Sequence, residues 1–228
     1  MLDKELIEAI ERANQGLEPP SSGELRISIF GSPASVQSSK SVKNKYLEQI
    51  KDALLRYKFL LTGQLVLEIT WLVPAKSRYE TDAKADIDNC IKPILDAFTG
   101  PAGLFIDDCQ LKGLYICWRH IESGDERLDF YFNFDPIQWC NKNSLAFIRM
   151  DSSLCIFVDT AWPKAEKQLF IDLLKMRQQE KAELEQSNVS YLATVSLMGG
   201  SQPFHRSRTC KFPIYSPESF IEGGCADN

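Results

Sequence analysis

The chain is poor in histidine and lacks cysteines spaced for metal binding, and both shortages narrow its chemistry. Its 228 residues include only two His, His120 and His205, which lie far apart in the sequence. Seven Cys are present, an odd number, and no two of them form a Cys-x-x-Cys pair. A disulfide framework, a zinc site and a histidine-based metal centre are therefore not expected, and reduced thiols in a cytoplasmic protein are the simplest interpretation.

Long apolar runs are also missing. No stretch approaches the roughly 18 apolar residues of a membrane-spanning helix. The first residues are acidic and include no apolar signal core, so neither a membrane span nor a secretion signal is expected. The remaining composition, 44% hydrophobic and 25% charged, is ordinary for a folded protein. The length suits one domain with an appendage or two small domains.

The charge is low for a protein that binds nucleic acid, but it is unevenly distributed. The net charge is −5. Residues 21–80 contain nine basic and five acidic side chains, whereas residues 81–135 contain five basic and eleven acidic ones. A metal ion would neutralise part of the acidic excess, and the basic segment could hold a phosphate backbone.

The periodicity of apolar residues predicts an α+β protein. Expected helices cover residues 2–14, 42–59, 88–98 and 163–186, and expected strands cover 25–30, 64–73, 104–106, 111–119, 127–134, 144–149, 154–158 and 191–197. The strands at 111–119 and 127–134 are expected to pair antiparallel. The expected parts are an N-terminal helix and linker (1–23), a compact domain with a mixed sheet and two helices (24–135), a C-terminal α+β extension (136–198) and an irregular tail (199–228).

Two pairs of aspartates suggest a metal site. Asp86 and Asp88 enter an expected helix, and Asp107 and Asp108 follow it after a Gly-containing turn. A short helix–turn–strand unit can bring its two ends together, and four neighbouring carboxylates repel one another unless a cation lies between them. All-oxygen ligands favour Mg²⁺ or Mn²⁺. Lys92, one helical turn after Asp88, could stabilise negative charge on a phosphate, so the pattern indicates metal-assisted phosphodiester chemistry.

Simpler explanations exist for each part of this pattern. Asp is a common cap at a helix N-terminus, the second acidic pair alone would be an ordinary turn, and Lys92 could form only an ion pair within its helix. A calcium-binding loop starting at Asp86 is excluded, because Ile91 and Ala97 stand where it needs Gly and Glu. An Asp-x-Asp site for a nucleotide-sugar donor would explain the first acidic pair but not the second.

Basic side chains before the motif are candidates for contacts with a nucleic-acid backbone. They are Lys40, Lys43 and Lys45 around the start of the second expected helix, and Arg78 and Lys84 in the loop that leads to the motif. Lysines on a helix face are more often simply solvated, so their clustering beside an acidic motif is what makes them candidates.

The segment from Asp86 to Phe98, followed by Gly103 to Gln110, resembles the signature of RusA-type Holliday-junction resolvases. That family's pattern is Asp-x-Asp-Asn-x-x-Lys, a helix, a Gly-containing turn and Asp-Asp-x-Gln, and the resemblance covers about residues 24–134. It implies a Mg²⁺-dependent endodeoxyribonuclease that cuts branched DNA as a homodimer. By residue match, the metal ligands would be Asp86, Asp88, Asp107 and Asp108, and the catalytic residues Asp86, Asp88, Lys92 and Asp108.

The chain differs from this family pattern in its added C-terminal residues and its acidic net charge. Both features indicate a protein partner, which could bind through the C-terminal extension, or a substrate other than a four-way junction. In the rival interpretation, the RusA-like domain is a DNA-binding or assembly module of a larger complex, with little or no nuclease activity of its own.

Overall fold

The chain divides into two structural units, Met1–Lys142 and Asn143–Asn228. The computed structural model describes residues 4–33, 39–81, 86–122, 124–150, 153–198 and 203–226, apart from the side chains of Leu6, Lys43 and Met198. Both units combine helices with sheets, so the expected α+β class is confirmed. Among the described helices, none combines the length and the apolar character needed to cross a membrane.

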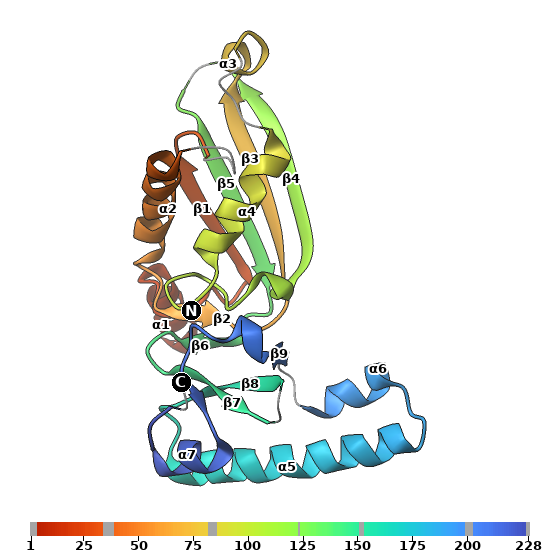
Figure 1. Cartoon of the computed structure of the whole chain (residues 1–228). Coiled ribbons are helices and arrows are strands. Elements are labelled where there is room, and N and C mark those ends of the chain that lie inside the picture. The colour runs from red at the N-terminus through yellow and green to blue at the C-terminus, as the bar shows by residue number, and fades with distance from the viewer. Residues whose placement is uncertain are drawn as a thin grey trace. The chain divides into compact units, whose positions relative to one another are not determined.

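The first unit is built on a four-stranded sheet with the strand order β1-β5-β3-β4 (Figure 1). Its strands are β1 (Glu24–Phe30), β5 (Arg127–Phe134), β3 (Leu65–Pro74) and β4 (Leu111–Ile121). Strand β5 runs antiparallel to β1 and β3, whereas β3 and β4 are parallel. A separate two-stranded sheet pairs β2 (Phe59–Leu61) with β6 (Trp139–Asn141).

The expected hairpin between residues 111–119 and 127–134 is wrong, because β3 lies between these two strands. Strand β5 buries every second residue, whereas every residue of β4 is at least partly exposed. A strand with this exposure suits the edge of a sheet. The alternating pattern identified both strands correctly, but it did not specify their neighbours.

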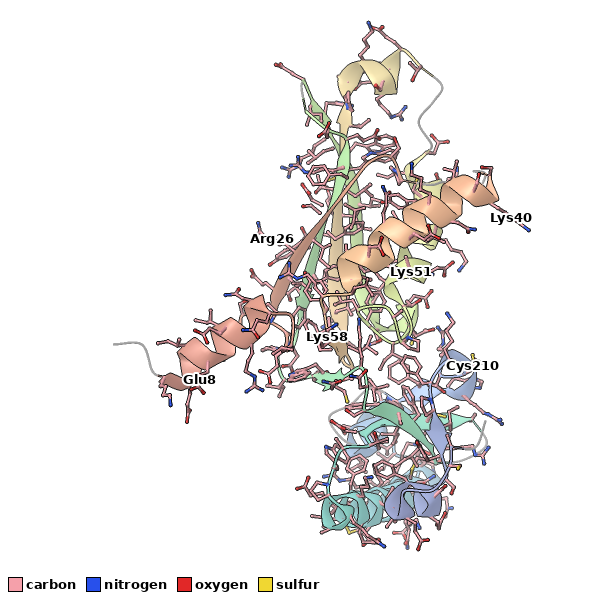
Figure 2. The ribbon with its side chains drawn as sticks, turned by 90° about the vertical axis from the view of Figure 1, so that its left-hand side faces the viewer. Glu8, Arg26, Lys40, Lys51, Lys58 and Cys210 are labelled. Atoms are coloured by element: carbon pink, nitrogen blue, oxygen red, sulfur yellow. The ribbon has the colours of Figure 1, made fainter. Side chains whose placement is uncertain are left out.

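Two helices, α2 (Lys40–Leu54) and α4 (Ile87–Phe98), cover one face of this sheet (Figures 1 and 2). Ile50 of α2 and Phe98 of α4 are fully buried in the core that they share with the sheet. The Phe98 ring packs edge-on against Phe130 and Phe132, with centroids 4.9 and 5.2 Å apart. Aromatic packing therefore fixes the C-terminal end of α4 on β5.

The other short elements of the first unit are α1 (Lys4–Asn14), α3 (Ala75–Tyr79) and the 3₁₀ turn η1 (Asp108–Gln110). The helix expected at 42–59 ends at Leu54, and the residues from Phe59 onward form β2 instead. The strand expected at 104–106 is reduced to isolated bridges from Phe105 to Leu61 and Thr99.

The second unit has its own sheet, with the order β10-β7-β8-β9. Its strands are β7 (Leu145–Arg149), β8 (Leu154–Asp159), β9 (Phe204–His205) and β10 (Ile214–Tyr215), and its helices are α5 (Lys164–Gln186), α6 (Tyr191–Thr194), η2 (Val195–Met198), η3 (Arg206–Arg208) and α7 (Pro217–Glu222). Ile148, Ile171 and Phe220 lie in its core.

Two expectations for the second unit are wrong. The segment 191–197, expected to be a strand, forms α6 and η2, because the Ser190 hydroxyl caps α6 by accepting a hydrogen bond from the Ala193 N–H at 3.4 Å. The tail from residue 199, expected to be irregular, contains β9, η3, β10 and α7. Phe204, Phe212 and Phe220 are buried there, so apolar anchors give this Gly- and Pro-rich segment a defined structure.

Candidate active site

The first acidic pair lies at the N-terminus of α4. Asp86 is the N-cap, with φ −68° and ψ 150°, and its carbonyl accepts the N–H of Asn89 at 3.1 Å. Among the described residues, the Asp86 carboxylate caps no N–H of the helix. Both Asp86 and Asp88 are exposed. Side-chain capping therefore does not account for Asp86, and both carboxylates face solvent where the helix dipole favours negative charge.

Lys92 lies on the exposed side of α4, four residues after Asp88, so the two side chains share one side of the helix. Its ammonium is 3.3 Å from Asp96, and the two side chains are 73% and 57% exposed. An ion pair this exposed contributes little to stability. The pairing is therefore weak enough for Lys92 to exchange Asp96 for another anion.

The second acidic pair begins η1, between α4 and β4. The Asp107 carboxylate accepts the N–H of Cys109 at 3.0 Å, and the Gln110 side chain accepts the N–H of Asp107 at 3.0 Å, which forms a capping box. Asp107 is half-buried, whereas Asp108 is exposed. Asp107 thus shapes the turn, and Asp108 is the carboxylate that the turn presents to solvent.

Gln110 ties this turn to the rest of the first unit. Its side chain is fully buried and accepts a hydrogen bond from the Ile106 N–H at 2.7 Å, besides the one from Asp107. Its amide nitrogen donates to the carbonyls of Leu61 at 3.0 Å and Gly63 at 2.8 Å. The turn is therefore attached to the connection between β2 and β3.

Glu126, which the sequence did not indicate as a site residue, contributes negative charge to the surroundings of Cys90, as the first acidic pair does. Burial, and then the negative charges of the first acidic pair and of Glu126, together raise the pKa of the Cys90 thiol to about 11. The Glu126 carboxylate accepts hydrogen bonds from the Trp71 indole at 2.9 Å and from the Ser32 hydroxyl at 2.5 Å. Only the tertiary structure fixes the position of Glu126, because its hydrogen-bond partners come from β3 and from the turn after β1.

The two acidic pairs lie at opposite ends of the sheet. The Asp108 turn leads into Leu111, which pairs with Leu65 at the start of β3. The α4 N-terminus lies toward the other end, near α3, which directly follows the end of β3 (Figure 1). Helix α4 connects these ends with 12 residues, a length of about 18 Å, and Figure 1 shows it running along the sheet from the α3 end toward β2.

The expected convergence of four aspartates within one chain is therefore not observed. In the described ranges, no group of three or more His, Cys, Asp or Glu side chains could hold a metal ion. The physical reason is that the turn after α4 leads onward into η1 at the far end of the sheet, rather than back to the start of the helix. The roles of these residues in metal binding and catalysis stay predictions.

The candidate contacts to nucleic acid lie on different elements. Lys40 and Lys45 are exposed on α2, and Lys40 extends from its first turn into solvent (Figure 2). The Arg78 guanidinium lies 4.2 Å from the ring centroid of Trp118, which stacks on Trp71 at 4.4 Å. Arg78 is thereby held at the same end of the sheet as the first acidic pair. Lys84 and the side chain of Lys43 lie outside the described residues.

Comparison with known proteins identifies the family. The model of the RusA endodeoxyribonuclease family matches residues 8–128, slightly more than half of the chain. The chain therefore belongs to the RusA endodeoxyribonuclease family, and the resemblance seen in the sequence is confirmed. The match includes both acidic pairs and Lys92, and it ends before the second unit begins. No curated protein matches the chain.

Proposed function

We propose that this chain is a metal-dependent endonuclease that cleaves phosphodiester bonds in branched DNA such as four-way junctions. The family to which it belongs is one of endodeoxyribonucleases, which supports DNA hydrolysis as the reaction class. The observation that carries the proposal is the exposed acidic pair at the α4 N-terminus, with Lys92 on the same helix, inside the segment that matches the family.

The residues at the α4 N-terminus fit a hard divalent cation. Asp86 and Asp88 offer exposed carboxylate oxygens, and Glu126 adds a third negative charge to their surroundings. Oxygen ligands without nitrogen or sulfur suit Mg²⁺ or Mn²⁺. Such an ion, when bound, supplies Lewis-acid assistance and lowers the pKa of a water molecule. Asp86 and Asp88 would hold it, and Lys92 would bind the negative charge of the scissile phosphate.

Asp108 would have to join this site from a second copy of the chain. Within one chain, α4, which is about 18 Å long, lies between Asp86 and the turn that leads to Asp108. We propose a two-fold homodimer in which the Asp108 turn of one subunit lies beside the α4 N-terminus of its partner. Two equivalent sites related by a two-fold axis would match the two-fold symmetry of a four-way junction.

The Asp88→Asn variant tests the active-site assignment. It should lower the rate of Mg²⁺-dependent nicking of a labelled four-way junction by at least about 100-fold. A loss of this size is typical when one contact that stabilises the transition state is removed. Junction binding in EDTA and the melting temperature should change little. Asp52→Asn, an exposed aspartate on α2, is the matched control and should cut normally. Wild-type cleavage by Asp88→Asn would refute the assignment.

Mixing two inactive variants tests the shared site. If each site takes Asp88 from one subunit and Asp108 from the other, Asp88→Asn and Asp108→Asn subunits that exchange at random form heterodimers with one intact site. An equal mixture should then recover about a quarter of wild-type nicking, because half of the dimers carry one working site of two. Recovery of no activity after verified subunit exchange would show that the residues act within one chain.

The rival function is a DNA-binding or assembly module with little or no nuclease activity. The second unit favours it, because this unit lies outside the segment that matches the family. Nicking assays on junction, flap and linear duplex DNA, with Mg²⁺ or EDTA, separate the two. Tight junction binding without nicking under any of these conditions would support the module.

A further inference from the structure

The second unit contains a basic turn, residues 205–211, outside the segment matched by the family. Its basic side chains are His205, Arg206, Arg208 and Lys211, and all four are exposed. No Asp or Glu occurs in the sequence between Glu185 and Glu218. The segment that contains the turn therefore has basic side chains and no acidic ones, so it is positively charged.

Two buried phenylalanines anchor the basic turn. Phe204 and Phe212, one before and one after it, are 1% and 5% exposed. Both pack edge-on against Phe147 of β7, with ring centroids 5.7 and 5.4 Å apart. At the start of the turn, the Arg206 N–H donates to the Ser153 carbonyl at 2.7 Å. The ends of the turn are therefore fixed to the sheet.

Hydrogen bonds within the turn fix its path between these anchors. Thr209 is fully buried, and both its N–H and its hydroxyl donate to the Arg206 carbonyl at 3.1 Å. The Phe212 N–H donates to the Thr209 carbonyl at 2.9 Å, and the Ser207 N–H donates to the His205 ring at 3.3 Å. The backbone is thus ordered before any ligand binds, which lowers the entropy lost on binding.

The turn borders a hollow of about 820 Å³ on the surface of the second unit. Arg206, Lys211, Ser207 and Tyr215 contribute to its lining. Among the described residues, the side chains of Arg206 and Lys211 form no ion pair with a carboxylate. Cys210 lies between these two residues in the sequence, and Figure 2 shows it at the surface of this unit. The hollow therefore presents positive charge, a hydroxyl and an aromatic ring together.

We propose that this basic turn binds the phosphodiester backbone of nucleic acid, with Arg206 and Lys211 as the phosphate contacts. The Arg206 guanidinium can bind two phosphate oxygens at once, and Lys211 adds a point charge. The hollow is much larger than one phosphate ion needs, and the Tyr215 ring offers a surface for a sugar or an unpaired base. The second unit would then extend the DNA-contact surface, whether or not the α4 site cleaves DNA.

The salt dependence of DNA binding tests this proposal on the full chain. Binding to a fluorescein-labelled duplex of about 30 base pairs is measured by anisotropy in EDTA over a range of salt concentrations. Log K falls with log salt, and each lost phosphate contact makes this negative slope less steep by about 0.9. Arg206→Gln/Lys211→Gln should therefore make the slope less steep by about 1.8 and weaken binding about 60-fold near 0.1 M salt.

A matched control separates local contacts from a change in net charge. Lys164→Gln/Lys175→Gln removes the same charge from exposed positions on α5 of the same unit and should bind as the wild type does. Arg206→Lys/Lys211→Arg retains both charges and should keep most of the slope, which attributes a loss in the Gln variant to the missing charges. Equal slopes for the two Gln variants would overturn the proposal.

Alkylation of Cys210 provides a local readout. The exposed Cys210 thiol should react with iodoacetamide more slowly when duplex DNA is bound, as measured by peptide mass spectrometry, and this protection should vanish in Arg206→Gln/Lys211→Gln. Polyglutamate of similar length is the comparison polyanion. If Arg206→Gln/Lys211→Gln loses polyglutamate binding but keeps DNA binding and Cys210 protection, the turn recognises an acidic protein segment and the proposal is wrong.

Discussion

Replacing Gln110 with Leu would remove the hydrogen bonds that hold the second acidic pair. The Gln110 side chain is 0% exposed and forms four hydrogen bonds, accepting from the N–H groups of Ile106 and Asp107 and donating to the carbonyls of Leu61 and Gly63. Leu has a similar size, so the core volume is nearly retained. The change therefore removes polar partners and leaves packing largely as it was.

The expected loss of stability follows from the groups left behind. The Leu61 and Gly63 carbonyls and the Ile106 N–H are in buried residues, whereas Asp107 is half-buried and can reach water. A buried group without a partner costs about 1–3 kcal/mol. Three such groups together would cost at most about 3–9 kcal/mol of stability, and relaxation of the turn reduces this cost. We expect Gln110→Leu to lower the free energy of unfolding by about 3–5 kcal/mol.

Urea unfolding monitored by circular dichroism measures this effect. Gln168→Leu is the matched control, because Gln168 is exposed on α5 and its amide donates to Asp172 at 3.0 Å. Its free energy of unfolding should stay within about 0.5 kcal/mol of the wild-type value. A loss below about 1 kcal/mol for Gln110→Leu would mean that the four hydrogen bonds do not hold the turn.

Two further predictions concern the first unit. A Cβ atom on Gly103 would overlap the backbone carbonyl of Phe98, so Gly103→Ala should lower the free energy of unfolding by at least about 1 kcal/mol, and an unchanged melting curve would contradict this close approach. Burial, and then the charge of Lys58, lowers the pKa of Lys142 to about 8 from 10.5. Between these two pKa values, Lys142 is protonated more in the unfolded chain than in the folded one. The free energy of unfolding of the wild type should therefore rise with pH relative to that of Lys142→Met. Parallel pH profiles of the two proteins would refute this prediction.

The elements of the first unit could be predicted where their periodicity was strong. Strand β3 alternates buried with more exposed residues along its length, and α4 buries Cys90, Ile94 and Phe98 at helical spacing. Strand neighbours could not be predicted this way, because alternation reports burial on one face and carries no information on the adjacent strand. The position of β3 between β4 and β5 is seen only in the tertiary structure.

The members of the acidic motif could be predicted from spacing, but their arrangement could not. Asp86 and Asp108 are separated by a rigid helix and by the turn after it, and the direction of that turn depends on the packing of Phe98 and the hydrogen bonds of Gln110. Glu126 left no local signal, because its position depends on hydrogen bonds to Ser32 and Trp71, which are distant in sequence. Contacts between distant segments decide both features.

The acidic net charge is compatible with DNA binding because charges of opposite sign occupy different places. Exposed carboxylates lie at the α4 N-terminus, where they would repel a phosphate until a cation is bound. Attraction for the backbone must then come from cations elsewhere, and exposed basic residues occur on α2 and in the basic turn of the second unit. A chain organised in this way can bind DNA without metal and still require metal to cleave it, so binding and cleavage should be separable in EDTA.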